Sequence, residues 1–552
     1  MEKSVQQDVP LPPTIPSSVV VRSQSPPASI HHSIVSDSSD SDDSRYTLSK
    51  EEIERLGRVR PECFKSAWSE IGFVLSICMS QILTSRAPIQ EYFVSGFNLL
   101  VPSVVEAFKI PATSATWPAS AFSLVISCFL LPFGRLSDMY GGKIMFVLGV
   151  GWLVVWSVVA GVAKNELMLD LARALAGLGP AAFLPSSVML MGCVYRPGPR
   201  KNLVFSFYGA CAPLGFFFGI FFAGISAQYS LWRSYFFIGA LFAAISFVLA
   251  WVSVPSDKEE RSTLNIKMDW PGTILIVSGL ILVVYAITDS SRAPHGWRSP
   301  NIWVTFAAGV CMLLGAVYVE GWVSQQPLLP SDIWQVPMFP AVVAAMFMQY
   351  GGLGIFLLYS TFYVDGVMGA GPLQIVAWFT PLFVGGMIIA TVGGFVLHII
   401  SGTILMITAG VAWVIAPLLF AIMPDGASYW AFVFPAMIMA TVGIDISFNI
   451  TNIFITTGLP KRQQGLAGAI INSNMHLSIA FFLGFAEIIS AKTHHQGIRI
   501  SYKAVFWFEI ALALVALIIM VMWVRVSKAK CDLTADEKEM ERERSRSRGS
   551  EN

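Results

Sequence analysis

Charged residues are scarce in this 552-residue chain, at 13% of the total, and they are unevenly distributed. Residues 1–68 carry 18 of the 71 charges and residues 525–552 carry 15. The 456 residues between these tails are therefore only about 8% charged, against about 25% in an average soluble domain. A water-soluble enzyme of this composition would expose too much apolar surface, so that class is excluded.

Other absences exclude further classes. The seven cysteines form no CxxC pair, which argues against a metal site and against the disulfide framework of a secreted domain. A net charge of +1 offers no basic surface to nucleic acid. No P-loop pattern is present, so ATP-driven pumping has no support and we expect no cofactor. The N-terminus lacks an apolar signal-peptide region, so the first membrane span must act as its own insertion signal.

Apolar residues, in contrast, make up 55% of the chain and gather into long runs. A membrane-spanning helix needs about 20 such residues, and fourteen segments qualify. They lie near residues 70–104, 115–133, 144–163, 167–194, 203–226, 234–254, 270–288, 302–320, 337–363, 372–396, 399–423, 428–458, 465–490 and 504–526. The sequence therefore predicts an all-α polytopic membrane protein of fourteen spans, with both tails on one side of the lipid bilayer.

Lysine and arginine in short loops indicate which side that is, because cytoplasmic loops carry an excess of them. With both tails in the cytoplasm, the inner loops hold ten such residues and the outer loops eight, which is a weak preference. The basic residues Arg525, Lys528 and Lys530 directly after the last span favour the same orientation. We expect both termini in the cytoplasm and, without a targeting motif, location in the plasma membrane.

Both tails have the composition of disordered segments. Residues 1–68 are rich in serine and proline and include the acidic run SDSSDSDDS at 36–44, and residues 527–552 are charged. Such segments cannot bury a core. The acidic run is either a phosphorylation target or simply a solvated part of the tail.

The first span is interrupted. Residues 85–90 read SRAPIQ, and within a bilayer Arg86 would be costly and Pro88 would break the helix. Removing these six residues would leave a smooth apolar segment that carries Glu91. We therefore interpret residues 85–90 as an insertion.

The loop after the second span, residues 134–143, reads GRLSDMYGGK. Its glycines allow a tight turn and a close helix approach, and Asp138 can accept hydrogen bonds from Arg135 or from a helix N-terminus. In sequence and position it resembles the signature loop of the major facilitator superfamily. The resemblance implies a gating role, which affects conformational cycling rather than substrate contact, for Gly134, Arg135, Asp138, Gly141 and Lys143.

Two further spans carry matching motifs. Arg173 in the fourth span resembles the arginine that proton-coupled members use in proton transfer, although a local ion pair with Asp170, one turn earlier, is the alternative. In the fifth span, small residues permit close helix crossing and Pro213 bends the helix. This span is similar to a degraded form of the superfamily's exporter motif, represented here by Gly209, Pro213 and Gly215.

Residues 460–469, at the start of the thirteenth span, look like those of fungal aminotriazole-resistance-type transporters, a group of fourteen-span drug:proton antiporters. The resemblance covers residues 70–526. It implies two six-helix bundles with two extra helices between them, a midplane binding site and alternating access. The expected parts are the tail 1–68, the bundle 69–254, the linker 255–336 with two extra spans, the bundle 337–526 and the tail 527–552.

Proton coupling needs an ionisable group that alternates between the two sides of the membrane. Glu91, Arg173 and Asp445 are the candidates. Polar residues that could line the central cavity are Asn98, Gln349, Tyr350, Trp378, Asn449 and Asn472, although helix–helix hydrogen bonding or interface anchoring would explain them equally well. Glu487 and Glu509, near the outer ends of their spans, are expected at the membrane interface.

The resemblance leaves open which solute is moved. The first hypothesis is proton-coupled efflux of toxic or secondary-metabolite small molecules by a monomeric transporter. The segment from Glu91 to Asn98 looks like an ammonium-linked branch of the same group, which motivates a second hypothesis, a low-affinity permease for ammonium or another small solute. A non-transporting membrane sensor is the third, and the short tails disfavour it.

Overall fold

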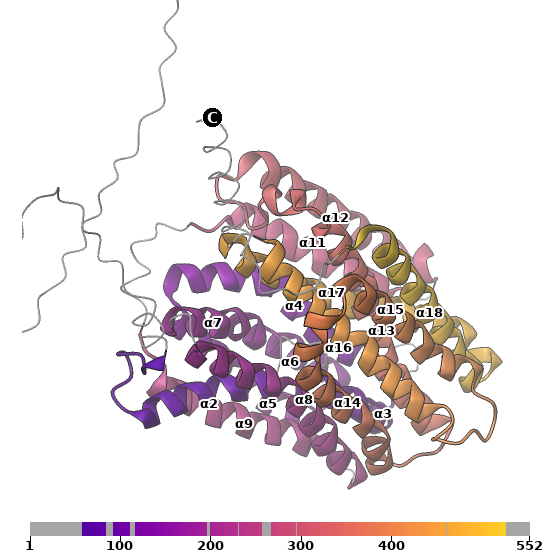
Figure 1. Ribbon diagram of the computed structural model, residues 1–552. Coiled ribbons are helices and arrows are strands. Elements are labelled where there is room, and N and C mark those ends of the chain that lie inside the picture. Colours follow the sequence, from indigo (N-terminus) through magenta and orange to yellow (C-terminus); the bar gives the residue numbers. More distant parts are fainter. Residues whose placement is uncertain are drawn as a thin grey trace, which may run out of the picture. The chain divides into compact units, whose positions relative to one another are not determined.

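The computed structural model describes residues 58–83, 92–110, 116–195, 199–229, 231–256, 267–293, 295–459 and 461–525. Throughout these residues the regular structure is helical (Figure 1). The helices of the N-terminal half are α2 (Ala67–Leu83), the π-helix η1 (Tyr92–Gly96), α3 (Phe97–Phe108), α4 (Trp117–Tyr140), α5 (Gly142–Gly161), α6 (Glu166–Ala176), α7 (Leu178–Val194), α8 (Pro199–Gln228) and α9 (Trp232–Ser253).

A helical pair and the C-terminal half follow. The pair consists of α11 (Trp270–Asp289) and α12 (Pro300–Tyr318), and α12 continues into the π-helix η4 (Val319–Val323). The C-terminal helices are α13 (Phe339–Gly366), α14 (Pro372–Ile399), α15 (Gly402–Ile422), α16 (Val433–Gly458), α17 (Lys461–Thr493) and α18 (Ile498–Trp523). Short 3₁₀ helices, η3 (Gly296–Arg298), η5 (Ser331–Gln335) and η6 (His494–Gln496), lie in connections.

Thirteen helical segments of the described residues are long and apolar enough to cross a membrane. One of them, Glu166–Val194, joins α6 and α7. Two shorter apolar segments, Ala67–Leu83 and Tyr92–Phe108, flank the predicted interruption and together supply the first of the fourteen expected crossings. Residues 84–91, which include the predicted insertion and Glu91, lie outside the described residues.

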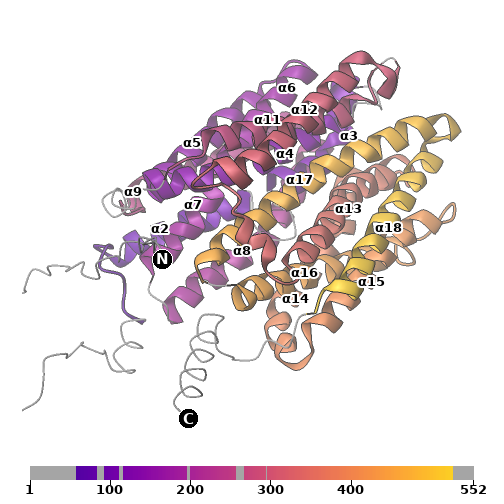
Figure 2. The same cartoon turned by 90° about the horizontal axis from the view of Figure 1, so that it is seen from above.

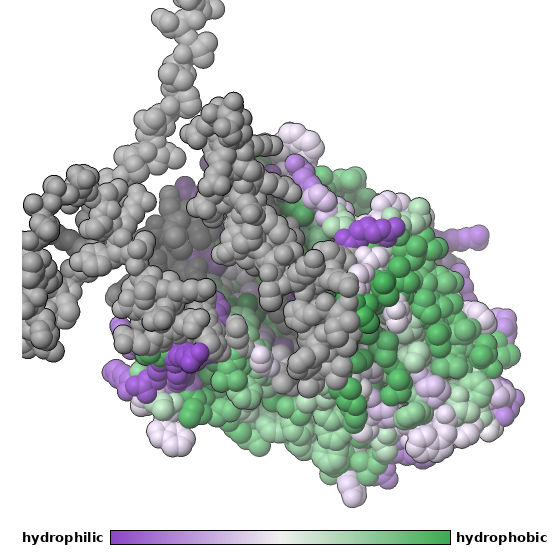
Figure 3. Space-filling view, viewed as in Figure 1, coloured by the Kyte–Doolittle hydropathy of each residue, from purple (hydrophilic) through white to green (hydrophobic). Residues whose placement is uncertain are grey.

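The outer surface of the helices is apolar, as a lipid-facing surface requires. Large side chains such as Leu148, Trp152, Val252 and Trp322 are exposed. Figure 3 shows hydrophobic side chains over much of the visible face, with hydrophilic ones gathered toward its margins. The described part of the chain is therefore a multi-pass membrane protein.

The helices pack as two groups. In the first, α5 packs against α7 and α9, and α2 packs against α8 and α9; in the second, α13 packs against α17 and α18, and α15 against α16 and α18. The groups, called halves below, meet where α4 contacts α17 and where α8 contacts α14 (Figure 2). The extra helices α11 and α12 pack against each other, and α11 contacts both α4 and α17.

Because the spans alternate in direction, the start of α2 and the end of α18 lie at one end of the bundle, here called the tail end. The connections from α4 to α5, from α7 to α8, from α9 to α11 and from α12 to α13 lie at this end too. The connections at the other end, called the far end, include those from α3 to α4 and from α11 to α12.

Candidate functional site

A cavity of about 590 Å³ lies between the halves at the tail end. It is lined by the last turns of α4 and α7, by the first turns of α17 and by residues between Pro327 and Ile333. Most lining side chains are apolar, and the polar ones are Arg135, Ser137, Asp138, Asp332 and Asn472. The structure thus brings Asn472, predicted as cavity-lining, together with Gly134, Arg135 and Asp138 of the predicted gating loop.

Two glycines of that loop form the tight turn and the close helix contact that the sequence allows. Gly141 ends α4 with φ of 97°, a conformation that favours glycine. Gly142 begins α5 so close to α7 that a Cβ atom there would lie 2.9 Å from Leu190 Cγ and even closer to Met189 Cε. The turn from α4 into α5, which Lys143 follows, is therefore fixed by packing against α7.

Arg135 ties this loop to both ends of the extra helical pair. Its Nε donates to the Lys267 carbonyl oxygen, just before α11, at 3.2 Å, and its Nη2 donates to Gln326 Oε1, just after η4, at 3.0 Å. Gln326 Oε1 also accepts from the Lys267 backbone N–H at 2.9 Å. One side-chain oxygen therefore holds the two ends of the pair and the loop together.

Replacing Gln326 by methionine removes this acceptor but keeps the length of the side chain. We expect the maximal transport rate to change about two- to fivefold, with apparent substrate affinity nearly unchanged, because exposed hydrogen bonds contribute only about 1 kcal/mol. Transport kinetics in proteoliposomes would measure both parameters. Gln325→Met, at the exposed neighbouring position, is the control. A change in affinity alone would contradict a role in gating.

At the far end the halves are in contact. The rings of Phe217 on α8 and Phe383 on α14 stack with centroids 4.8 Å apart. A Cβ atom on Gly224 of α8 would collide with Val376 of α14. A void of only about 10 Å³ lies between Ser95, Leu99, Phe216, Ile220, Leu357, Thr361 and Phe379, which come from both halves. Among the described residues, a cavity therefore separates the halves at the tail end, and the halves are in contact at the far end.

Arg173 is 2% exposed, and its guanidinium is held by main-chain oxygens rather than by a carboxylate. Its Nε donates to the Pro118 carbonyl oxygen, and both terminal nitrogens lie 3.4 Å from the Phe93 carbonyl oxygen. Its Cζ lies 3.5 Å from the centroid of the Phe97 ring. The predicted alternative, an ion pair with Asp170, is not among these contacts. Arg173 instead fastens η1 and α3 to the start of α4.

The span that carries the exporter-like motif, α8, approaches η1 closely at Gly219. A Cβ atom on Gly219 would lie 2.7 Å from both Tyr92 Cα and Ser95 Oγ, whereas one on Gly209 would meet nothing within 4 Å. Pro213 and Gly215 are buried within α8. The helix crossing predicted for this span therefore occurs at Gly219, against η1.

A second polar group lies within the C-terminal half. Asp445 on α16 is 6% exposed, and no described residue forms a hydrogen bond with its Oδ2. Gln349 of α13 donates to the Gly443 carbonyl oxygen at 3.1 Å and to Ser447 Oγ at 2.9 Å, and the buried Tyr350 hydroxyl also lacks a partner. The structure therefore brings three predicted residues, Gln349, Tyr350 and Asp445, to the interface of α13 and α16.

The other residues predicted to line the cavity lie elsewhere. Trp378 stacks on Tyr429, with ring centroids 4.9 Å apart, and lines neither described cavity. Asn98 is buried on α3, and Asn449 is half-buried on α16. Asn472, which does line the tail-end cavity, donates to the Gly468 carbonyl oxygen of its own helix.

The prediction that Glu487 and Glu509 lie at the membrane interface is wrong. They are 1% and 0% exposed, because α17 and α18 pack among other helices at these positions. Glu487 accepts from the Thr116 hydroxyl, while both oxygens of Glu509 lack a partner. The sequence carries a signal for Glu487: hydrophobic residues, FA before it and II after it, flank it on both sides.

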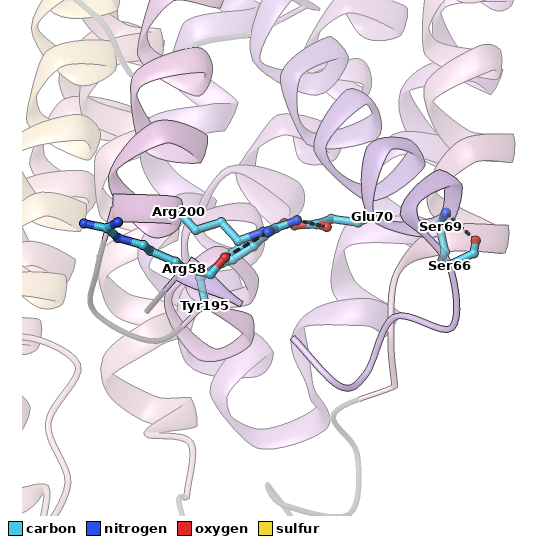
Figure 4. Close-up of polar contacts among 6 residues, drawn as sticks. All are labelled: Arg58, Ser66, Ser69, Glu70, Tyr195 and Arg200. Carbon is cyan, nitrogen blue, oxygen red and sulfur yellow. Dashed lines mark hydrogen bonds and ion pairs between the residues drawn. The ribbon is translucent and has the colours of Figure 1, made fainter. Parts of the chain in front are cut away.

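At the tail end, Glu70 joins α2 to α8 (Figure 4). Arg200 donates to both of its oxygens, at 2.7 and 2.5 Å, and the Tyr195 hydroxyl donates to Oε1 at 3.1 Å. The hydrogen bond to Glu70 raises the pKa of Arg200, and burial raises the pKa of Tyr195, so both remain donors. Arg200 also donates to the Arg58 carbonyl oxygen, which fixes the segment before α2.

Comparison with known proteins agrees with this architecture. The sequence profile of the Major Facilitator Superfamily matches residues 89–484. In Saccharomyces cerevisiae, a low affinity ammonium transporter is 30% identical, with 82% of this chain and 88% of that protein covered, and an aminotriazole resistance protein is 29% identical, with 82% and 83% covered. An efflux pump of Aspergillus terreus is 28% identical, with 86% and 90% covered.

Solved structures show the same fold. A crystal structure of a peptide transporter, POT, in complex with sulfate superposes with a TM-score of 0.59. The two chains are 13% identical, and the match covers 86% of this chain and 99% of that one. The likeness concerns the arrangement of helices, since so little of the sequence is shared.

Proposed function

The chain belongs to the major facilitator superfamily, and from this premise we propose that it exports largely apolar organic molecules in exchange for protons. The cavity at the tail end carries this proposal. Its volume of about 590 Å³ falls within the range of about 300–1,000 Å³ that is typical of sites for drug-sized ligands. Its lining is mainly apolar, with a few polar groups that can orient a ligand.

Such a cavity would bind an ammonium ion poorly. A small cation must exchange its hydration shell for protein oxygens, because burying an unpaired charge is costly. The cavity offers Asp138 and Asp332 but is otherwise dominated by side chains such as Leu131, Val188 and Leu466. This favours export of organic molecules. The similarity to a protein named as a low affinity ammonium transporter keeps ammonium uptake as the second candidate.

The direction of transport follows from the proposed orientation. With both tails in the cytoplasm, the cavity faces the cytoplasm and loads substrate there, while the far end stays closed. Rocking of the halves would then expose the substrate on the other side. We place the protein in the plasma membrane as a monomer. Arg173 and Asp445 are candidate coupling residues within the described residues, and Glu91 remains a candidate from the sequence.

Flux in proteoliposomes with an imposed pH gradient tests the function. The probes are rhodamine 6G and aminotriazole as organic substrates, with methylammonium and borate as small solutes. We expect an organic probe to move against its gradient and the movement to collapse when a protonophore is added. Methylammonium flux without organic flux would replace export by the ammonium hypothesis. No gradient-dependent flux of any organic probe would contradict the proposal.

A further inference from the structure

Glu487 occupies an unusual place at the contact between the halves. It projects from α17 toward Thr116, the residue that precedes α4, and the Thr116 hydroxyl donates to its Oε2. The other carboxyl oxygen, Oε1, is buried and has no hydrogen-bond partner among the described residues. A carboxyl group that is 1% exposed, with a hydrogen-bond partner for only one of its oxygens, is costly to retain in a membrane protein. Such groups usually serve transport.

The charged and titratable groups that face Glu487 come from several elements. Asp170 on α6 and Arg292, in the connection after α11, lie within electrostatic reach of it, as does Tyr359 on α13. Arg292 donates to Glu166 at 2.8 Å. Asp170 is itself 5% exposed, with an unpartnered Oδ1. Two buried carboxyl groups from opposite halves thus share one region of the far end.

The contact between Thr116 and Glu487 must break when the far end opens. Thr116 belongs to the N-terminal half and Glu487 to the C-terminal half, and alternating access separates the halves at the open end. Opening would remove the hydroxyl donor and admit water to the carboxyl group. Closure would again exclude water and restore the hydrogen bond from Thr116. The protonation of Glu487 is therefore coupled by geometry to the conformation of the transporter.

Polar side chains on the same helix extend from the tail-end cavity toward Glu487. His476 is eleven residues, or about three turns, before Glu487, and so lies on the same face of α17. Its ring is 3% exposed, and within the described part of the chain both ring nitrogens lack a hydrogen-bond partner. Asn472, one turn further, lines the cavity at the tail end. One face of α17 thus carries Asn472 and His476 near the cavity and Glu487 near the far end, with the apolar Ala480 and Leu483 between His476 and Glu487.

We propose that Glu487 is a proton-loading residue: its carboxylate binds a proton from the far side when the halves part there, holds it as the neutral acid in the dry closed contact, and gives it up to water that reaches it along α17 from the tail-end cavity. This inference rests on the proposed proton-coupled function and names the group that performs it. Asp170 and Arg292 set the local field, and Thr116 marks the closed state.

The test separates proton coupling from substrate movement. Proteoliposomes with wild type or Glu487→Gln are assayed for rhodamine 6G uptake driven by a pH gradient and for exchange of rhodamine 6G at equal pH. We expect Glu487→Gln to lose gradient-driven uptake by about tenfold or more while exchange stays within about twofold of wild type. Equal loss of both activities, or retention of both, overturns the proposal.

Glu509→Gln is the matched control. Glu509 is also fully buried with unpartnered oxygens, but it lies on α18 beside Gly352 and Trp413, within one half and away from α4. Loss of coupling in both variants would show a general cost of removing a buried carboxyl group and would overturn the specific role of Glu487. Thermal unfolding of each purified variant verifies that it is folded.

A second measurement does not depend on the substrate. Infrared difference spectra of the reconstituted protein after a pH step report protonation of carboxyl groups through their carbonyl stretch. We expect a band in wild type and Glu509→Gln that is missing in Glu487→Gln. If wild type moves no organic probe but shows this band, the export proposal fails and the inference stands. If the band is unchanged in Glu487→Gln, the inference fails even where export is established.

Discussion

Arg173→Lys is expected to lower transport by about tenfold or more, although the positive charge is kept. The planar guanidinium reaches the carbonyl oxygens of Pro118 and Phe93 at the same time and lies over the ring of Phe97. A lysine ammonium is a compact group that cannot span these partners. Leaving a buried carbonyl without a donor costs about 1–3 kcal/mol, so the attachment of η1 to α4 should weaken. Initial rates of rhodamine 6G uptake and thermal unfolding measure the two effects.

Arg233→Lys provides the comparison for this variant. Arg233 also donates to a main-chain oxygen, that of Ala163 at 3.0 Å, and lies 4.6 Å from the centroid of the Trp232 ring. Its side chain is exposed, however, so water can replace lost hydrogen bonds. We expect it to transport within about twofold of wild type. A lysine at position 173 that supported the wild-type rate would show that charge alone suffices there.

The crossings of the membrane could be predicted from sequence because a bilayer demands long apolar helices with internally satisfied backbones. The tight turn between α4 and α5 could be predicted for a similar reason. A positive φ requires glycine at position 141, and a close helix contact requires it at position 142. Both requirements are therefore visible in the sequence as the use of the smallest residue type at a turn. The sequence also predicts that polar partners hold Arg173, because an arginine without partners inside a span would be costly.

What could not be predicted is which helix faces meet. The partners of Arg173 proved to be carbonyl oxygens on η1 and in the first turn of α4, and no sequence pattern marks a carbonyl oxygen as free to accept. The burial of Glu487 depends on α4 lying against α17, a contact between residues 371 positions apart. Gln326 joins Arg135 from 191 positions away for the same reason. Such pairs are set by tertiary packing.

The glycines of α8 allow a prediction in which packing is the only variable. Gly219→Ala is expected to destabilise the protein by about 1–3 kcal/mol and to reduce transport severely, because its new methyl group would collide with the main chain at Tyr92. A main-chain atom cannot rotate away as a side chain can. Close approach of η1 to α8 would be lost, and with it the placement of the broken first span.

Gly209→Ala makes the same chemical change on the same helix, ten residues away, where the methyl group would meet nothing within 4 Å. Both substitutions gain about 1 kcal/mol of helix propensity, so the difference between them isolates the contact with η1. Thermal unfolding and uptake rates of the two variants should therefore diverge, with Gly209→Ala equal to wild type or slightly more stable. Equal behaviour of the two would mean that α8 does not pass η1 at Gly219, and the motif resemblance would then have to be explained by another glycine.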